Sequence, residues 1–235
     1  MSGGVIAIDG PSASGKSSTA RAVAEELGFA HLDSGSLYRG VTLVALREGS
    51  RRGLDEPGPS TLSPETILRA AEDRGLMLQP DGTGFAAYLE GEPAEDGLRS
   101  AEVTAHVSTI AAMPVVREWV NARLRALVRA GQDVVVDGRD IGTVVFPDAD
   151  LKIFLTASPQ ARAGRRISQR GMAVEPDHLD AETQALAARD HADSTRPVAP
   201  LRPAKDAVHL DTTSLDFREQ VRFIVERARP IFDRR

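Results

Sequence analysis

A chain of 235 residues with 41% apolar and 27% charged residues has the balance of a globular protein and enough length for one large domain. Its net charge of −5 excludes the overall basic character of nucleic-acid-binding proteins, and its lack of cysteine excludes disulfides and thiolate chemistry. No signal-peptide pattern and no apolar run near the roughly 18 residues that span a bilayer occur, so we expect a cytoplasmic protein without nucleic-acid or membrane partners.

Five short apolar segments are expected to form strands, and they lie at 5–9, 29–33, 133–137, 151–155 and 207–211. Most of them lack polar alternation, which is typical of a parallel sheet buried on both faces. Four of the segments end in aspartate, at Asp9, Asp33, Asp137 and Asp211. The carboxyl ends of parallel strands are where open α/β sheets bind ligands, so these positions are candidate site residues.

Helical patterns separate the strands, at about 15–27, 114–130, 159–170 and 215–229. This alternation predicts an α/β fold, a five-stranded parallel sheet with helices on both faces. Between the second and third strands, 50–64 has the composition of a loop, 75–93 predicts a hairpin with its turn at 81–84, and 99–112 predicts a helix. We interpret this region as an inserted lobe that covers a substrate; the alternative is a structural excursion with no ligand role.

The most informative motif follows the first strand and opens the first helix. The segment 10–17, GPSASGKS, fits G-x-x-x-x-G-K-[ST], a loop whose backbone N–H groups surround phosphates. The lysine reaches the β- and γ-phosphates, and the hydroxyl that follows can ligate Mg²⁺. We expect ATP to contact the loop and the start of its helix at Gly10, Pro11, Ser12, Ala13, Ser14, Gly15, Lys16, Ser17 and Ser18.

A second basic cluster favours a small kinase among the proteins with this loop. Arg162, Arg165, Arg166 and Arg170 share one face of the predicted helix 159–170. A solvated arginine face is the ordinary interpretation, but four arginines without an acid among them repel one another unless an anion lies nearby. A triphosphate would supply that anion. The N-K-x-D sequence that a GTPase uses for guanine is absent.

Four blocks of sequence resemble the bacterial cytidylate kinase family, in order along essentially the whole chain. They are GPSASGKSS, LDSGSLYRG (32–40), DGRDIGTVVFPDADLKIFL (137–155) and RDHADSTRPVAPL (189–201). The resemblance implies a P-loop fold and transfer of the γ-phosphoryl group of Mg-ATP to CMP or dCMP. It also implies a single kinase domain over 1–235, acting as a monomer, with a core at 1–62, 114–157 and 197–235. The nucleoside-monophosphate insert would span 63–113 and the lid 158–196.

The resemblance also assigns site residues. The acceptor nucleotide would contact Ser34, Tyr38, Arg39, Ser108, Arg117, Arg139, Asp140, Arg189, Asp193 and Arg196. Among them, Arg39 and Arg139 would meet phosphate, Ser108, Arg117 and Asp140 would read cytosine, and Arg189 and Asp193 would hold ribose. Arg162, Arg165 and Arg166 match the lid that closes over ATP. The implied catalytic residues are Lys16, Arg39, Arg139, Arg162 and Arg165, and Ser17 is the implied Mg²⁺ ligand.

Several of these residues could instead have a structural role, and the function has rivals. Tyr38 could be a core aromatic, Ser108 a surface hydroxyl and Arg117 a partner of Glu118. Asp137 could cap its loop or hold Mg²⁺ through water. The five histidines lack metal-ligand spacing and are expected to be structural. The rival functions are a small P-loop kinase for UMP or a non-nucleotide acceptor, and an ATP-binding regulatory module.

Overall fold

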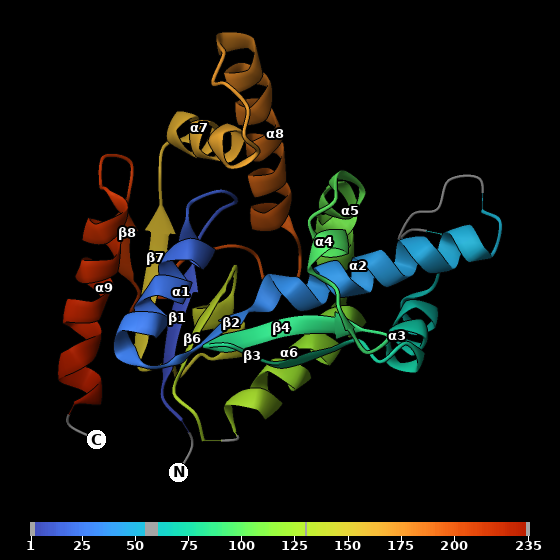
Figure 1. Cartoon of the computed structure of the whole chain (residues 1–235), viewed down its shortest axis with the longest axis horizontal. Coiled ribbons are helices and arrows are strands. Elements are labelled where there is room, and N and C mark those ends of the chain that lie inside the picture. The colour runs from blue at the N-terminus through green and yellow to red at the C-terminus, as the bar shows by residue number, and fades with distance from the viewer. Residues whose placement is uncertain (1–2, 55–60, 130, 234–235) are drawn as a thin grey trace. The chain divides into compact units, whose positions relative to one another are not determined.

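The computed structural model describes residues 3–54, 61–129 and 131–233 (Figure 1). The chain forms two compact units, one of Met1–Leu32 with Val128–Arg235 and the other of Asp33–Leu127. Among the described residues, no helix has both the length and the apolar content needed to cross a membrane. The hydrophobic pattern of the sequence predicts part of each unit. The elements without a predicted counterpart are α2 (Ser34–Arg51), α3 (Pro64–Asp73), α4 (Glu95–Leu98), α8 (Pro176–Thr195) and η1 (Ile141–Val145).

The sheet of the first unit contains all five predicted strands. They are β1 (Val5–Asp9), β2 (Ala30–Asp33), β6 (Val134–Gly138), β7 (Leu151–Thr156) and β8 (Val208–Asp211). Their order is β2-β6-β1-β7-β8. Strand β1 pairs in parallel with both β6 and β7, and β7 pairs in parallel with β8. The predicted α/β class with a mostly parallel sheet is therefore confirmed, and the strands lie within about one residue of their expected positions.

Two helices enclose the core of this unit. Helix α1 (Lys16–Leu27) packs against α9 (Phe217–Phe232), and both contact the sheet. The core between the helices and the sheet is formed by fully buried aliphatic side chains such as Ile6, Ile8, Val23 and Ile224. Helix α1 ends at Gly28, whose φ of 70° is the left-handed conformation that glycine adopts readily. This packing fixes the start of α1 directly after β1, which is where the phosphate-binding motif lies.

Two further helices and a π-helix complete the first unit. Helix α7 (Pro159–Gln169) begins as expected at Ser158, whose hydroxyl accepts a hydrogen bond from the backbone N–H of Ala161. It packs against α8 (Pro176–Thr195), which the sequence pattern did not define. The π-helix η1 (Ile141–Val145) follows β6 and was also not predicted. Its five residues belong to the DGRDIGTVVFP block, so part of this block forms the π-helix.

The second unit contains five helices and three antiparallel strands in its described part. The helices are α2 (Ser34–Arg51), α3 (Pro64–Asp73), α4 (Glu95–Leu98), α5 (Ala101–Ala111) and α6 (Pro114–Val128, whose last residue belongs to the first unit). Helix α2 contacts α3, α4 and α5. The strands β3 (Met77–Asp81), β4 (Gly84–Leu89) and β5 (Glu92–Pro93) form the predicted hairpin region with its turn at 81–84.

The prediction of a loop at 50–64 is only partly correct. Helix α2 continues to Arg51 and α3 begins at Pro64, while 55–60 lie outside the described residues. The sequence pattern did not predict α2, although it has a helical signature. Asp33 caps it by accepting a hydrogen bond from the backbone N–H of Gly35 at 2.8 Å, and Leu37, Val41 and Val44 form a buried stripe.

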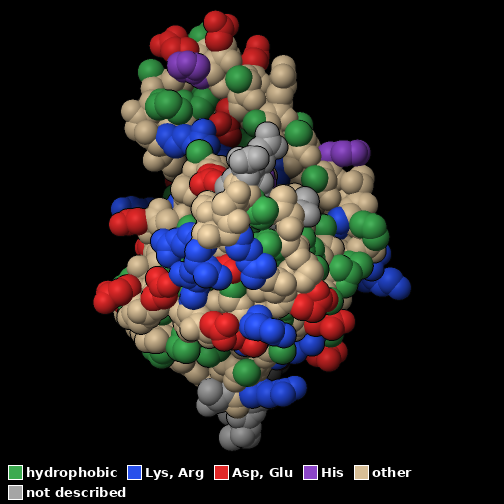
Figure 2. All heavy atoms as spheres, turned by 90° about the vertical axis from the view of Figure 1, so that its right-hand side faces the viewer, with side chains coloured by type: hydrophobic (Ala, Val, Ile, Leu, Met, Phe, Trp, Pro, Cys, Tyr) green, Lys and Arg blue, Asp and Glu red, His purple; other side chains and the backbone are tan. Residues whose placement is uncertain are grey.

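Charged side chains of both signs lie next to one another on the surface shown in Figure 2. The second unit gives an example at the end of α2, where the buried carboxylate of Glu48 accepts hydrogen bonds from Arg51 and Arg52. Hydrogen bonds from these two guanidiniums lower the pKa of Glu48 to about 2. The arginines there are thus held by a neighbouring acid of the same unit.

Candidate nucleotide-binding site

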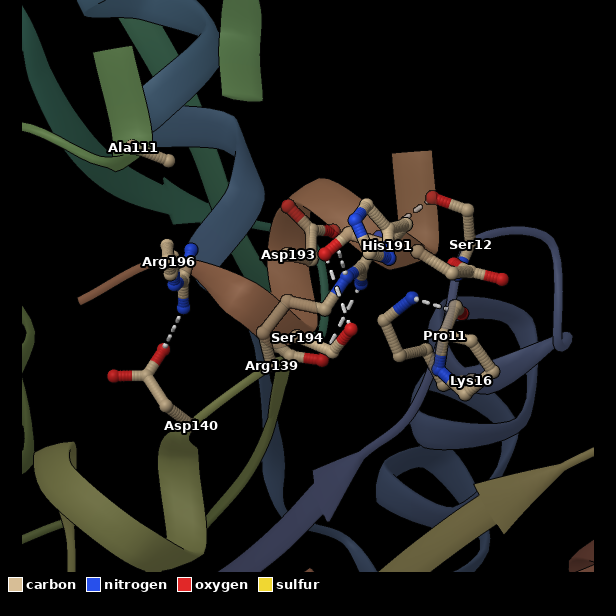
Figure 3. Close-up of polar contacts among 12 residues, drawn as sticks. Pro11, Ser12, Lys16, Ala111, Arg139, Asp140, His191, Asp193, Ser194 and Arg196 are labelled. Atoms are coloured by element: carbon tan, nitrogen blue, oxygen red, sulfur yellow. Dashed lines mark hydrogen bonds and ion pairs between the residues drawn. The ribbon is translucent and has the colours of Figure 1, made fainter. Parts of the chain in front are cut away.

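The Gly-rich loop connects β1 to α1 and has a tightly constrained backbone. A Cβ atom on Gly10 would lie 2.2 Å from the backbone oxygen of Leu155, so only glycine fits at that position. Ala13 and Gly15 have φ values of 57° and 93°, both in the left-handed region. The ammonium of Lys16 donates to the backbone oxygen of Pro11 at 3.2 Å, so the lysine folds over its own loop (Figure 3).

A buried carboxylate lies next to the hydroxyl that follows the lysine. Ser17 Oγ donates to Asp137 Oδ2 at 2.5 Å, and His31 Nε2 lies 2.8 Å from Asp137 Oδ1. Burial by itself would raise the pKa of Asp137, but the hydrogen bond and charge of His31, the charge of Lys16 and the Ser17 hydroxyl hold it below its usual range. Asp137 is therefore a carboxylate, and both of its oxygens are engaged.

A second buried carboxylate connects β1 to η1. Asp9 accepts hydrogen bonds from the backbone N–H groups of Ile141 and Gly142, each at 2.8 Å. Burial raises the pKa of Asp9 to about 6, against the two backbone donors and the charge of Lys16, while the charge of Asp140 adds to the increase. This residue fixes the start of η1 and, with it, the backbone that carries Asp140.

The Arg139 and Asp140 pair that follows β6 points toward two different partners (Figure 3). Arg139 Nε donates to Asp193 at 2.9 Å and its Nη2 donates to Ser12 Oγ at 2.8 Å, which links the Gly-rich loop to α8. Asp140 accepts from Arg196 Nη2 at 3.4 Å, and both of these side chains are buried. Although burial opposes it, the charges of Arg139, Arg189 and Arg196 keep the pKa of Asp193 below its usual range.

Two arginines of α7 bind the backbone of the Gly-rich loop. Arg162 Nη1 donates to the Ser12 oxygen at 3.0 Å and also forms an ion pair with Asp190. Arg165 Nη1 donates to the Ser14 oxygen at 3.3 Å, and the same guanidinium also bonds Thr212. These two arginines thus lie against the loop that is expected to bind phosphate.

The acids that accompany these arginines come from α8. Asp190 pairs with Arg162 and also accepts from the backbone N–H of Ser12 at 3.0 Å. Glu182 pairs with Arg166 at 3.0 Å and with Arg170 at 2.8 Å. The inference that this arginine cluster requires an external anion is therefore wrong, because it considered one helix alone, whereas carboxylates of the next helix lie against it.

The second unit holds the other expected contacts of the acceptor nucleotide. Arg39 Nη1 donates to the Leu98 oxygen at 3.0 Å and to Thr104 Oγ1 at 3.1 Å. The Arg117 guanidinium carbon lies 5.4 Å from the centre of the Tyr38 ring, a cation–π geometry. Arg117 also donates to the Ala111 oxygen at 3.0 Å. Ser34 begins α2, whereas Ser108 lies on α5.

The structure groups the expected site residues unevenly. In the first unit it brings the Gly-rich loop together with Arg139, Arg162, Arg165 and Asp193. Ser18 is exposed on α1, and the described contacts link it to none of the other site residues. Three charged or titratable residues of the site were not assigned from the sequence: His31, Glu182 and Asp190. Asp190 had a signal, because it lies in the block RDHADSTRPVAPL, and Asp9 was already a candidate from its place at the end of a strand.

The fold and the site define a class of protein. A parallel α/β sheet, a G-x-x-x-x-G-K-S loop between β1 and α1, and arginines of a neighbouring helix on that loop are the features of a small P-loop phosphotransferase. Within this class the chain belongs to the cytidylate kinase family, because the family model described as "Cytidylate kinase" matches residues 6–230.

Individual relatives agree with the family model. The chain is 43% identical over 222 residues to a cytidylate kinase of Streptomyces griseus subsp. griseus, covering 94% of this chain and 90% of the relative. It is 41% identical over 221 residues to a cytidylate kinase of Geobacillus sp., covering 94% of each chain. A cytidylate kinase of Rhodococcus jostii is 44% identical over 213 residues, or 90% of this chain and 88% of the relative.

Proposed function

We propose that this protein transfers the γ-phosphoryl group of Mg-ATP to CMP and dCMP, which yields CDP and dCDP. The observation that carries the proposal is the meeting of Lys16, Arg139, Arg162 and Arg165 at one Gly-rich loop, in a chain of the cytidylate kinase family. Phosphoryl transfer needs mostly positioning and stabilisation of charge, and this cluster of cations supplies both.

The Gly-rich loop is proposed to bind the phosphates of ATP. Its backbone N–H groups and the N-terminus of α1 provide donors and a positive dipole end, which favour an anion. Lys16 would exchange its hydrogen bond to the Pro11 oxygen for one to a phosphate oxygen. Arg166 of α7 is proposed to join these ATP contacts, with residues 158–196 acting as the lid.

The arginines are proposed to stabilise the phosphoryl group as it moves. An oxygen of the acceptor phosphate forms a bond to the γ-phosphorus while the bond from that phosphorus to the ADP oxygen breaks. The acceptor phosphate is already anionic, so the reaction needs no general base. Guanidinium groups such as those of Arg39, Arg139 and Arg162 pair with phosphate oxygens through two parallel hydrogen bonds.

The acceptor nucleoside is proposed to be recognised by the residues that the family resemblance assigns. Asp140 would accept a hydrogen bond from the cytosine N4 amine, the expected direct readout of that base. Ser108 and Arg117 would contact the ring, and Ser34, Tyr38 and Arg39 would line the monophosphate pocket. Arg189 and Asp193 would hold the ribose, and Arg196 would be a further arginine that faces the ligand.

Mg²⁺ is proposed to be held with ATP by Ser17 and Asp137. Their oxygens fit this hard cation, which usually takes one or two protein oxygens together with phosphates and water. When bound, Mg²⁺ neutralises charge on the β- and γ-phosphates. A monomeric state and a cytoplasmic location stay predictions.

The experiment that tests the function measures diphosphate formation from Mg-ATP with CMP, dCMP, UMP, AMP, GMP and shikimate. We expect fast turnover of CMP and dCMP and far slower turnover of the other acceptors. Comparable UMP turnover would indicate a general pyrimidine kinase and would contradict the cytosine-reading roles of Ser108, Arg117 and Asp140. ATP binding without transfer to any acceptor would indicate a regulatory module instead.

A further inference from the structure

His31 is a buried histidine with a specific place beside the nucleotide site. It lies on β2, the strand next to β6 in the sheet, and only 5% of its surface is exposed. Its Nε2 atom lies 2.8 Å from Oδ1 of Asp137, the aspartate near the end of β6. A carboxylate can only accept a hydrogen bond, so Nε2 carries the hydrogen and donates it.

The same carboxylate makes its second contact at the Gly-rich loop. Asp137 Oδ2 accepts from Ser17 Oγ at 2.5 Å, which places Asp137 between β2 on one side and α1 on the other. A serine that donates its hydrogen to a carboxylate keeps its oxygen lone pairs for a cation. The three residues form a chain of hydrogen bonds that leads from the interior of the sheet to the proposed Mg²⁺ ligand.

We propose that His31 is a positioning residue for the binding of the metal-nucleotide complex. Its hydrogen bond to Oδ1 prevents rotation of the Asp137 carboxylate and so keeps Oδ2 directed toward Ser17 and Mg²⁺. This inference rests on the proposed function, because it concerns the Mg²⁺ bound with ATP. Carboxylates at metal sites are commonly held by such second hydrogen bonds, and removal of the partner typically costs about 10–100-fold in metal affinity or activity.

A purely structural role of His31 would also explain its burial, but it predicts a different effect of its loss on nucleotide binding. Asp137 is 1% exposed, and a buried charge needs partners for the stability of the fold. If His31 only stabilised the folded chain, its loss would lower the melting temperature and leave the Mg²⁺ dependence of nucleotide binding unchanged. A positioning role instead predicts that binding of the metal complex weakens while binding of the metal-free nucleotide does not.

The test uses four variants of the full chain and ADP as the probe. His31→Leu removes the donor and keeps a buried side chain of similar size. His31→Gln keeps an amide donor at the distance of Nε2, whereas His31→Asn is equally polar and too short to reach Asp137. His209→Leu removes an exposed histidine of β8 and serves as the control. Calorimetry gives the dissociation constant of ADP with EDTA and with saturating Mg²⁺, and electron paramagnetic resonance gives Mn²⁺ bound with ADP.

We expect His31→Leu and His31→Asn to weaken Mg-ADP and Mn-ADP binding about tenfold and to change metal-free ADP binding less than about twofold. His31→Gln should keep most of the wild-type metal dependence. The inference is overturned if Gln and Asn behave alike, or if metal-free and metal-bound ADP weaken equally. If His31→Leu does not fold, the comparison of Gln with Asn decides. Because the titrations contain no acceptor, a failed acceptor assay would refute the proposed function without affecting this result.

Discussion

At the scale of single residues, the site consists of charges that are buried and paired. Asp9, Asp137 and Asp193 are all buried, and each has at least two hydrogen-bonding or charged partners. Burial is the largest single effect on the pKa of all three; it prevails at Asp9, whereas at Asp137 and Asp193 nearby cations and hydrogen bonds together outweigh it. Each environment therefore has its own consequence for stability and function.

The raised pKa of Asp9 predicts a specific pH dependence of stability. Its pKa is about 6 in the folded state and 3.8 in the reference state, so the folded chain binds more protons between these values. The free energy of unfolding that Asp9 contributes should fall as the pH rises from about 4 to 6, by roughly 3 kcal/mol at most. Denaturant titrations of the wild type and Asp9→Asn at several pH values measure this difference.

Carboxylates with lowered pKa values, such as Asp193, change stability in the opposite direction and would mask the effect of Asp9 in the wild type alone. Both proteins contain those carboxylates, so the difference between their stabilities isolates Asp9. Two curves that remain parallel over pH 4–6 would show that the carboxyl of Asp9 titrates in the folded state as it does in the unfolded chain.

Loss of a cation that is proposed to contact phosphate should remove most of the transfer activity without unfolding the protein. Lys16→Ala and Arg39→Ala are each expected to lower kcat/KM about 100-fold or more, because a charge that stabilises the transition state disappears. Melting temperatures should remain close to that of the wild type. Coupled assays of ADP formation measure the rates, and Lys205→Ala, which removes an exposed lysine, is the control. Near-normal rates in either variant would contradict the site.

At the scale of elements, α8 is the helix that connects the arginines to the Gly-rich loop. Its Asp190 holds both Arg162 of α7 and the backbone N–H of Ser12, and its Asp193 holds Arg139. These contacts cross long sequence separations, for example 178 residues between Ser12 and Asp190. One helix therefore sets the positions of cations that come from two other segments.

Removal of the Asp190 carboxylate should destabilise the protein more than loss of an exposed ion pair. In Asp190→Ala, the buried Arg162 loses its acidic partner, so we expect a loss of about 1–3 kcal/mol in the free energy of unfolding. The control is Glu90→Ala, which breaks the more exposed pairs with Arg74 and Arg47 and should cost less than about 1 kcal/mol. Chemical denaturation of both variants gives the comparison. Equal losses of unfolding free energy would show that the Asp190 contact of α8 stabilises the protein no more than an exposed ion pair does.

At the scale of the whole molecule, the proposed function predicts stabilisation by the acceptor nucleotide. A ligand at 100 times its dissociation constant adds about 2.7 kcal/mol to the free energy of unfolding, provided that it binds only the folded state. For a chain of this length, that increase corresponds to roughly 5–10 °C in melting temperature. Thermal denaturation with CMP should show this shift, and the same concentration of UMP should give a clearly smaller one. Equal shifts would argue against selection of cytosine.

The sequence by itself determined the strands of the parallel sheet, the Gly-rich loop, the family and five helices, namely α1, α5, α6, α7 and α9. These features depend on local patterns: continuous apolar runs, a glycine-rich loop of fixed spacing, and caps such as Ser158. Helix α2 and the ends of its neighbouring loop were missed even though the stripe of Leu37, Val41 and Val44 was present. The π-helix η1 could not be found this way, because its shape depends on hydrogen bonds to Asp9.

Only the tertiary structure decided the pairing of charges. His31 and Asp137 are 106 residues apart, Asp9 and Ile141 are 132 apart, and no periodic pattern in the sequence connects them. The arginines of α7 looked unbalanced in the sequence because their acids lie on α8. A hydrogen bond depends on the distance and direction between two atoms, and the packing of the sheet and helices sets both of these.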